Sequence, residues 1–291
     1  MRTLRFLALM VAIGCLAASS GQAQELRLPQ NGVAGQAMTV GTTGSGEGTL
    51  YLVGPGQVLK RQVQFGSDVQ IKAGELQSAG RWLAILRASS NSRSQAFWVR
   101  PGPPENLSFL ARPSRVPVAR PGVISGIAVV FDGFQNLVLS PTAVKFSLSM
   151  DGAGAGVSET VASRDGVAWV NSSSARKAGP AQFVATAGDT SVRRVVQQVA
   201  SDPCNLRMHV VERNKNGVIV ETDPVRDCTS NPVPDGTIVT FTQTDSRGRS
   251  TVDARIKKGI ARAVLPSADN AVITVASGVV LGNELHVGDS R

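Results

Sequence analysis

The chain has 291 residues, which is enough for two or three domains of ordinary size. Its 42% hydrophobic residues exclude a disordered chain, and its 30 glycines and 15 prolines are typical of short strands joined by turns. The formal net charge of +9 raises nucleic acid as a partner, but only 4% of residues are aromatic and no recognition motif occurs, so no nucleic-acid binding is predicted.

Residues 1–23 have the three parts of a secretory signal peptide. Arg2 and Arg5 precede the apolar run FLALMVAIGCLAA, and the small residues of SSGQA follow it. We expect cleavage after Ala23, with a lipoprotein site at Cys15 as the alternative. The predicted location is therefore outside the cytoplasm: periplasmic, cell-surface or extracellular. The remaining chain has no second apolar run long enough for a transmembrane helix.

After the signal, strand patterns follow one another with turn residues between them. Residues 24–101 contain AMTVGT and TLYLVG, and end with AGRWLAIL and SQAFWVRP, which read as the last two strands of a β-sandwich. The proline-rich RPGPPEN then marks a boundary. The pattern predicts an all-β fold of tandem Ig-like antiparallel sandwiches.

The next two segments repeat each other. NLVLSPTAVKF begins at Asn136 and NPVPDGTIVTF at Asn231, and Asn, Val, Thr, Val and Phe recur at the same places. In each copy a Gly-x-Ala segment follows, beginning at Gly166 or at Gly259. We therefore predict sandwiches at 103–200 and 201–291, and 24–101 as a divergent third.

Each copy is expected to build the same part of its sandwich. Phe146 and Phe241 should point into the two cores, with Val144 and Val239 two residues earlier on the same face of the strand. The asparagine that begins each copy should hold the preceding turn, because its side chain can bond its own backbone.

These residues resemble the group-one bacterial Ig-like repeat of intimin and invasin type. In that family V-x-D-x-x-x-N-x-V leads into a V-x-F strand, and G-x-A opens a later strand. The middle segment matches at Asp132, Asn136, Val144, Phe146, Gly166 and Ala168; the last segment matches at Asn231, Val239, Phe241, Gly259 and Ala261. In the last segment ETDPVRDCTS reads as an insertion at the place of the Asp-containing turn. The resemblance implies a modular protein of the bacterial surface.

Cleavage of the signal would leave two cysteines, Cys204 and Cys228. An even number in an exported chain predicts one disulfide. It would tie the first strand of the last sandwich to the loop ETDPVRDCTS.

A basic stretch in the last sandwich is the candidate binding surface. In STVDARIKKGIARAVL the alternation places Val252, Ala254 and Ile256 inward, followed after a turn at Lys258-Gly259 by Ala261, Ala263 and Leu265. If the two runs pair as a hairpin, five cations gather on and behind one exposed surface: Arg247, Arg249, Arg255, Lys257 and Arg262. The hypothesis is an anion-binding face, and the alternative is a solvated basic strand.

No catalytic site, cofactor or metal site is predicted. His209 and His286 lie in strand-like runs, and the S-x-x-K match at Ser174 to Lys177 lies in a turn, where that chemistry needs a helix. The carboxylates Glu212, Glu221, Asp223 and Asp227 fit no calcium-loop spacing and read as solvated loop charges.

The sequence thus predicts a non-enzymatic exported protein that acts as a structural or adhesive module of the bacterial cell envelope. The alternative is a soluble binding subunit for a glycan or for an envelope or secretion complex. The partners that suit its charge are acidic polysaccharide, lipopolysaccharide or another envelope protein.

Overall fold

The computed structural model describes residues 25–89, 91–150, 156–268 and 270–288. The predicted signal peptide, with Cys15, lies outside the described residues. Every regular element described is a β-strand, so the all-β prediction is confirmed. The chain forms two compact units, residues 1–102 and 103–291, and we describe each by itself.

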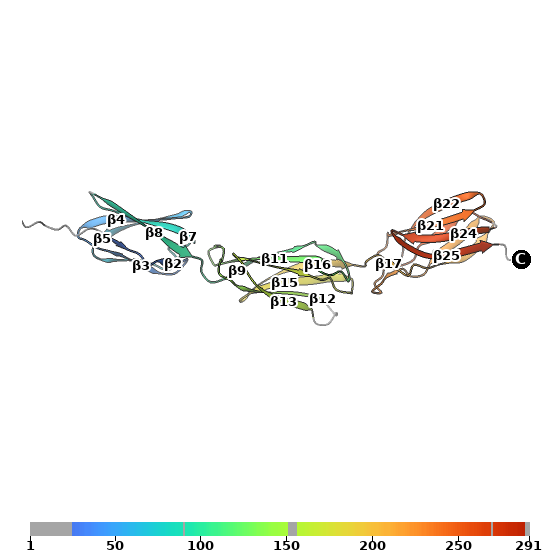
Figure 1. Cartoon of the computed structure of the whole chain (residues 1–291), viewed down its shortest axis with the longest axis horizontal. Helices are drawn as coiled ribbons and strands as arrows, with labels where there is room; N and C mark the ends of the chain where they lie inside the picture. Colours follow the sequence, from blue (N-terminus) through green and yellow to red (C-terminus); the bar gives the residue numbers. More distant parts are fainter. Residues whose placement is uncertain (1–24, 90, 151–155, 269, 289–291) are drawn as a thin grey trace, which may run out of the picture. The chain divides into compact units, whose positions relative to one another are not determined.

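The first unit is a sandwich of two sheets, with β4 on one side and β3 on the other (Figure 1). The three-stranded sheet contains, in spatial order, β1 (Leu26–Arg27), β3 (Met38–Thr42) and β6 (Asp68–Ile71). The five-stranded sheet contains β2 (Asn31–Val33), β8 (Ser92–Arg100), β7 (Gly80–Arg87), β4 (Glu47–Gly54) and β5 (Gln57–Gln64). As the sequence predicts, AGRWLAIL and SQAFWVRP supply its last two strands.

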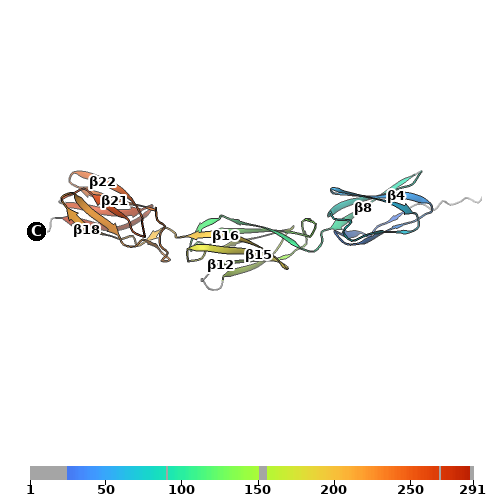
Figure 2. The same cartoon turned by 180° about the vertical axis from the view of Figure 1, so that it is seen from behind.

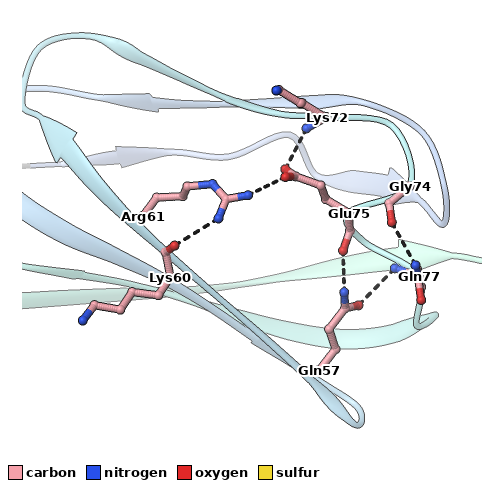
Figure 3. Close-up of polar contacts among 7 residues, drawn as sticks. All are labelled: Gln57, Lys60, Arg61, Lys72, Gly74, Glu75 and Gln77. Atoms are coloured by element: carbon pink, nitrogen blue, oxygen red, sulfur yellow. Dashed lines mark hydrogen bonds and ion pairs between the residues drawn. The ribbon is translucent and has the colours of Figure 1, made fainter.

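The loop after β6 ties the two sheets of the first unit together (Figure 3). Arg61 on the edge strand β5 forms an ion pair with Glu75, whose Oε2 accepts a hydrogen bond from the backbone N–H of Lys72 at 2.9 Å. Gln57 accepts from the backbone N–H of Gln77 at 3.0 Å and donates to the carbonyl of Glu75. The loop that leaves one sheet is thus bound to the edge of the other.

The second unit begins with a sandwich of the same plan. Its five-stranded sheet contains β10 (Arg115–Pro117), β16 (Thr190–Val199), β15 (Gly179–Ala187), β12 (Ala143–Met150) and β13 (Val157–Ala162). Its three-stranded sheet contains β14 (Val167–Ser172), β11 (Ile124–Phe131) and β9 (Asn106–Arg112). Pairing is antiparallel except at two places, where the short strands β2 and β10 run parallel to β8 and β16.

The rest of the second unit forms a further sandwich. One sheet contains β18 (Met208–Asn214), β19 (Gly217–Thr222) and β23 (Arg262–Leu265). The other contains β22 (Gly248–Arg255), β21 (Ile238–Asp245), β24 (Asn270–Ser277) and β25 (Val280–Gly288). A small ladder joins β17 (Pro203–Cys204) to β20 (Arg226–Asp227).

Three separate hydrophobic cores hold these sandwiches, one in the first unit and two in the second. Phe146, Phe241, Val144 and Val239 are each at most 1% exposed. The prediction for the strands that contain the two copies of the repeat is therefore confirmed. Phe146 packs with Phe109 and Phe183, with ring centroids 5.9 and 6.2 Å away. The exact division into three domains stays a proposal, because the compact units number two.

Candidate functional site: the Asp–Asn loops of the second unit

The loop before β12 is organised by the buried carboxylate of Asp132. Its Oδ1 accepts hydrogen bonds from the backbone N–H groups of Phe134 at 2.9 Å and Asn136 at 2.8 Å. Its Oδ2 accepts from the side-chain amide of Asn136 at 2.8 Å. The aspartate therefore holds the turn, and the asparagine binds the aspartate. We expected the asparagine side chain to hold the turn by bonding its own backbone; in the structure the aspartate side chain binds the backbone of the turn.

The loop before β21 repeats this network with Asp227 and Asn231. Oδ1 of Asp227 accepts from the backbone N–H groups of Thr229 at 2.8 Å and Asn231 at 2.9 Å, and Oδ2 accepts from the Asn231 amide at 3.1 Å. In both loops the aspartate backbone N–H also donates to the asparagine carbonyl at 2.9 Å. Asp227 is thus the counterpart of Asp132. The interpretation of ETDPVRDCTS as an insertion at the place of this turn is wrong, because the segment itself contains the aspartate that holds the turn.

The Gly-x-Ala segments form the turn that lies against each loop. Asp165 and Gly166 both have positive φ, at 49° and 81°, and so do Lys258 and Gly259, at 53° and 85°. Two consecutive residues with positive φ form a tight turn that strongly favours glycine. The carbonyls of Gly166 and Gly259 accept hydrogen bonds at 2.9 and 2.8 Å from the backbone N–H groups of Val130 and Val225, which lie two places before the aspartates.

The second loop makes contacts that connect it to the preceding part of the unit. The backbone N–H of Ser201 donates to Oδ2 of Asp227 at 3.0 Å. The side chain of Asn231 donates to the carbonyl of Arg176 at 2.7 Å and accepts from the backbone N–H of Ala178 at 2.8 Å. The amide nitrogen and the amide oxygen of Asn231 thus both bind the segment between β14 and β15. This loop joins one sandwich to the next.

Asp227 is held in its ionised form. Burial disfavours the charge and by itself raises the pKa of the carboxyl, since only 4% of the residue is exposed. The hydrogen bonds from the Thr229 hydroxyl and from the backbone N–H groups of Asn231 and Ser201 outweigh burial, so the pKa of Asp227 lies below its usual value.

The predicted disulfide is present beside this loop. Cys204 and Cys228 are bonded, with their Cα atoms 4.9 Å apart and a sequence separation of 24. The bond links β17 to the residue that follows Asp227.

Removal of the disulfide should destabilise the last sandwich. In the chain-entropy account a loop of this length contributes about 3 kcal/mol, because the bond restricts the unfolded chain. We expect the variant with both cysteines changed to serine to have a free energy of unfolding lower by this amount, and therefore to unfold at a lower denaturant concentration. A reducing agent should shift the parent chain to the same midpoint and leave the variant unchanged. A parent chain insensitive to reduction would contradict the prediction.

The candidate anion-binding face is not assembled as expected. β22 pairs with β21 in one sheet, whereas β23 pairs with β19 in the other. Figure 2 shows β22 and β18, the neighbour of β19, on opposite sides of the sandwich. The turn at Lys258-Gly259 forms, with an isolated bridge between Lys257 and Ile260, but the two runs do not pair beyond it. The inward and outward alternation holds: Ile256 and Ala263 are buried, Arg255 and Arg262 exposed.

The five cations are therefore distributed over two sheets and the adjoining turns, and no single strand pair carries them. Arg255 and Arg262 belong to different sheets, and Arg249 is six residues, or about 20 Å, from Arg255 along β22. Arg247 is already bound to Asp245 at 3.1 Å and to the carbonyl of Ser267. Anion binding by these residues stays a hypothesis. The paired hairpin that was expected to bring them onto one surface is not formed.

The other residues examined for chemistry have identifiable structural contacts. Ser174 is buried, donates to the carbonyl of Pro117 at 2.8 Å and accepts from the backbone N–H of Arg120 at 2.9 Å. His209 and His286 lie beside Asp223 at 3.3 Å and Glu284 at 3.1 Å, with all four side chains at least half exposed.

The described residues include no group of three or more His, Cys, Asp or Glu side chains that could hold a metal ion. Within the same described ranges there is no helix long and apolar enough to cross a membrane.

The likeness to solved structures is at the level of fold. The adhesin FdeC of Escherichia coli matches with a TM-score of 0.56 and 15% identity, over 89% of this chain and 94% of that one. InvD of Yersinia pseudotuberculosis matches with a TM-score of 0.52 and 12% identity, over 89% and 96%. These matches confirm the tandem Ig-like architecture that the resemblance implies. No protein-family model and no curated protein matches the sequence.

Proposed function

We propose that the chain is a non-enzymatic exported protein that serves as a structural or adhesive module of the bacterial cell envelope. One observation carries the proposal: the same Asp–Asn loop occurs in two consecutive sandwiches, and in the second it also binds the linker and the preceding sandwich. Such contacts serve the joining of modules. The buried polar side chains of Asp132, Asp227 and Asn231 are thereby used for architecture.

Two further points support the proposal. Residues 1–23 have the pattern of a secretory signal, and the disulfide is typical of oxidising compartments. One protein of similar fold, FdeC, is described as an adhesin. In this proposal the sandwiches comprise residues 24–101, 103–200 and 201–291.

Protease added to intact cells tests the surface location. We expect the chain to be cleaved in intact cells and a cytoplasmic marker protein to remain whole, because the sandwiches lie outside the cell. Protection in intact cells, with release into a soluble periplasmic extract, would instead favour the second candidate function, a soluble binding subunit for a glycan or an envelope complex. The exposed side chain of Trp98, on the five-stranded sheet of the first unit, is the observation that favours this second candidate.

A further inference from the structure

The outer face of the five-stranded sheet of the first unit is apolar at its centre. Val58, Val53, Leu83 and Ala96 are register partners on β5, β4, β7 and β8 and form one row across the sheet. All four are exposed, Val58 at 62% and Leu83 at 37%. A contiguous exposed apolar patch on a sheet face marks an interaction site more often than isolated apolar residues do.

An aromatic side chain lies on each side of this row, next to a cation. In the row of Tyr51, the register partners are Lys60 on β5 and Ile85 on β7. In the row of Trp98, which is 57% exposed, the partner on β7 is Arg81 and the partner on β2 is Asn31. Strand rise and strand spacing place the two aromatic residues about 16 Å apart.

The charge of this sheet is strongly one-sided. Its five strands contain six cations, Lys60, Arg61, Arg81, Arg87, Arg93 and Arg100, against one carboxylate, Glu47. Arg61 is paired with Glu75, but among the described residues Lys60 and Arg81 form no ion pair. Glu47 lies at the far end of β4 and accepts a bond from Gln64. A partner with negative charges would therefore meet free cations.

We infer that this face binds an anionic polysaccharide that carries carboxylate groups. The C–H face of a sugar ring stacks on the negative face of an aromatic ring, which Trp98 and Tyr51 supply. Arg81 and Lys60 beside them suit the carboxylates. Ser94 and Asn31 in the same two rows suit sugar hydroxyls. The distance of about 16 Å between the two aromatic residues fits several consecutive sugars of an extended chain.

An acidic protein is the other class of partner for such a surface, and the arrangement favours the sugar. Trp98 has polar register partners on both sides and Tyr51 has Lys60 on one side, so a cation lies next to each aromatic residue, whereas the core of a protein interface is depleted of charge. The middle sandwich provides the contrast. There Leu110, Ile127 and Trp169 form an uninterrupted exposed row without a cation among them.

The test measures binding of the purified chain to three polymers at low salt. Polygalacturonate carries both sugar rings and carboxylates, poly-L-glutamate carries carboxylates alone, and dextran carries sugar rings alone. We expect binding to polygalacturonate that weakens as salt is added, and at least tenfold weaker binding to the other two. Equal affinity for poly-L-glutamate would overturn the inference in favour of an acidic protein or simple charge attraction.

Matched variants locate the site on this face. Trp98→Ser should weaken binding roughly tenfold and Trp98→Phe should largely restore it, because phenylalanine keeps an aromatic face. Lys60→Ser with Arg81→Ser should also abolish most binding. Trp169→Ser, and the pair Arg193→Ser with Arg194→Ser, remove the same groups from exposed positions of the middle sandwich and should change affinity less than twofold.

Equal losses in the control variants would contradict the inference, as would an unchanged affinity of Trp98→Ser. Because Trp98 and Arg81 are exposed, each variant should keep the parent's unfolding temperature, which verifies folding. The biological role of this binding rests on the proposed adhesive function, but the binding assay needs only the purified chain. A negative result would leave the protease test on cells untouched.

Discussion

Replacement of Asp227 by alanine should destabilise the last sandwich by about 4 kcal/mol, because the carboxylate satisfies several buried donors at once. It accepts from the backbone N–H groups of Ser201, Thr229 and Asn231 and from two side chains. Without it the three backbone donors lose this acceptor at buried or half-buried positions, whereas the Asn231 side chain keeps its bonds to Arg176 and Thr229. Chemical denaturation of the parent and variant measures the difference.

Asp223→Ala is the matched control. Asp223 lies four residues earlier in the same segment, but its side chain is 56% exposed and its partner is His209. An exposed pair of this kind contributes less than about 1 kcal/mol. Equal effects of the two substitutions would mean that Asp227 does not organise the loop.

The lowered pKa of Asp227 also gives this sandwich a dependence on pH. The folded state holds the carboxylate ionised more strongly than the unfolded state does, so the unfolded chain binds the proton first as pH falls. The stabilisation should be fully present above the ordinary aspartate pKa, near pH 4, and be lost as pH falls through the lower folded pKa. The acid-induced loss of stability should be smaller in Asp227→Ala than in the parent; an equal loss would contradict the assignment.

Truncation of Phe146 to alanine should cost the middle sandwich about 4 kcal/mol, since it leaves a cavity in a packed core. The ring is 1% exposed and lies 5.9 and 6.2 Å from the rings of Phe109 and Phe183, which contact each other edge to face at 5.2 Å. Denaturant unfolding should show an earlier transition for this sandwich.

Phe134→Ala controls for the chemistry of the same substitution. Phe134 lies in the Asp132 loop and is 41% exposed, so its removal leaves no comparable cavity. We expect a loss below about 1 kcal/mol. A cost of that size for Phe146→Ala as well would show that the echoing phenylalanine does not hold the core.

The burial of Phe146 and Phe241 could be predicted because side chains alternate along a strand between the two faces of the sheet. The repeat shows that these two residues occupy equivalent positions in their strands. The role of Asp227 was missed although its signal is in the sequence. Asp132 stands four residues before Asn136, and Asp227 stands four residues before Asn231. The two copies were aligned only from their asparagines onward, so the aspartate four residues earlier was not included in the repeat.

Alternation does not say which strands are neighbours. Arg255 and Arg262 are correctly predicted as exposed, but a tight glycine turn can lead to the opposite sheet as well as back along the same one. For the same reason the surface of Tyr51 and Trp98 could not be found from the sequence. Those residues lie on strands that are not adjacent in the sheet, and only the register of β7 between them places both on one face.

We propose that this chain works outside the cytoplasm as a joined series of Ig-like sandwiches. The most direct test is the mass and thiol content of the chain recovered from its own cells. The account predicts a chain that begins at Gln24, in a non-cytoplasmic fraction, with Cys204 and Cys228 unreactive until reduced. A cytoplasmic chain that begins at Met1 and has free thiols at both positions would contradict it.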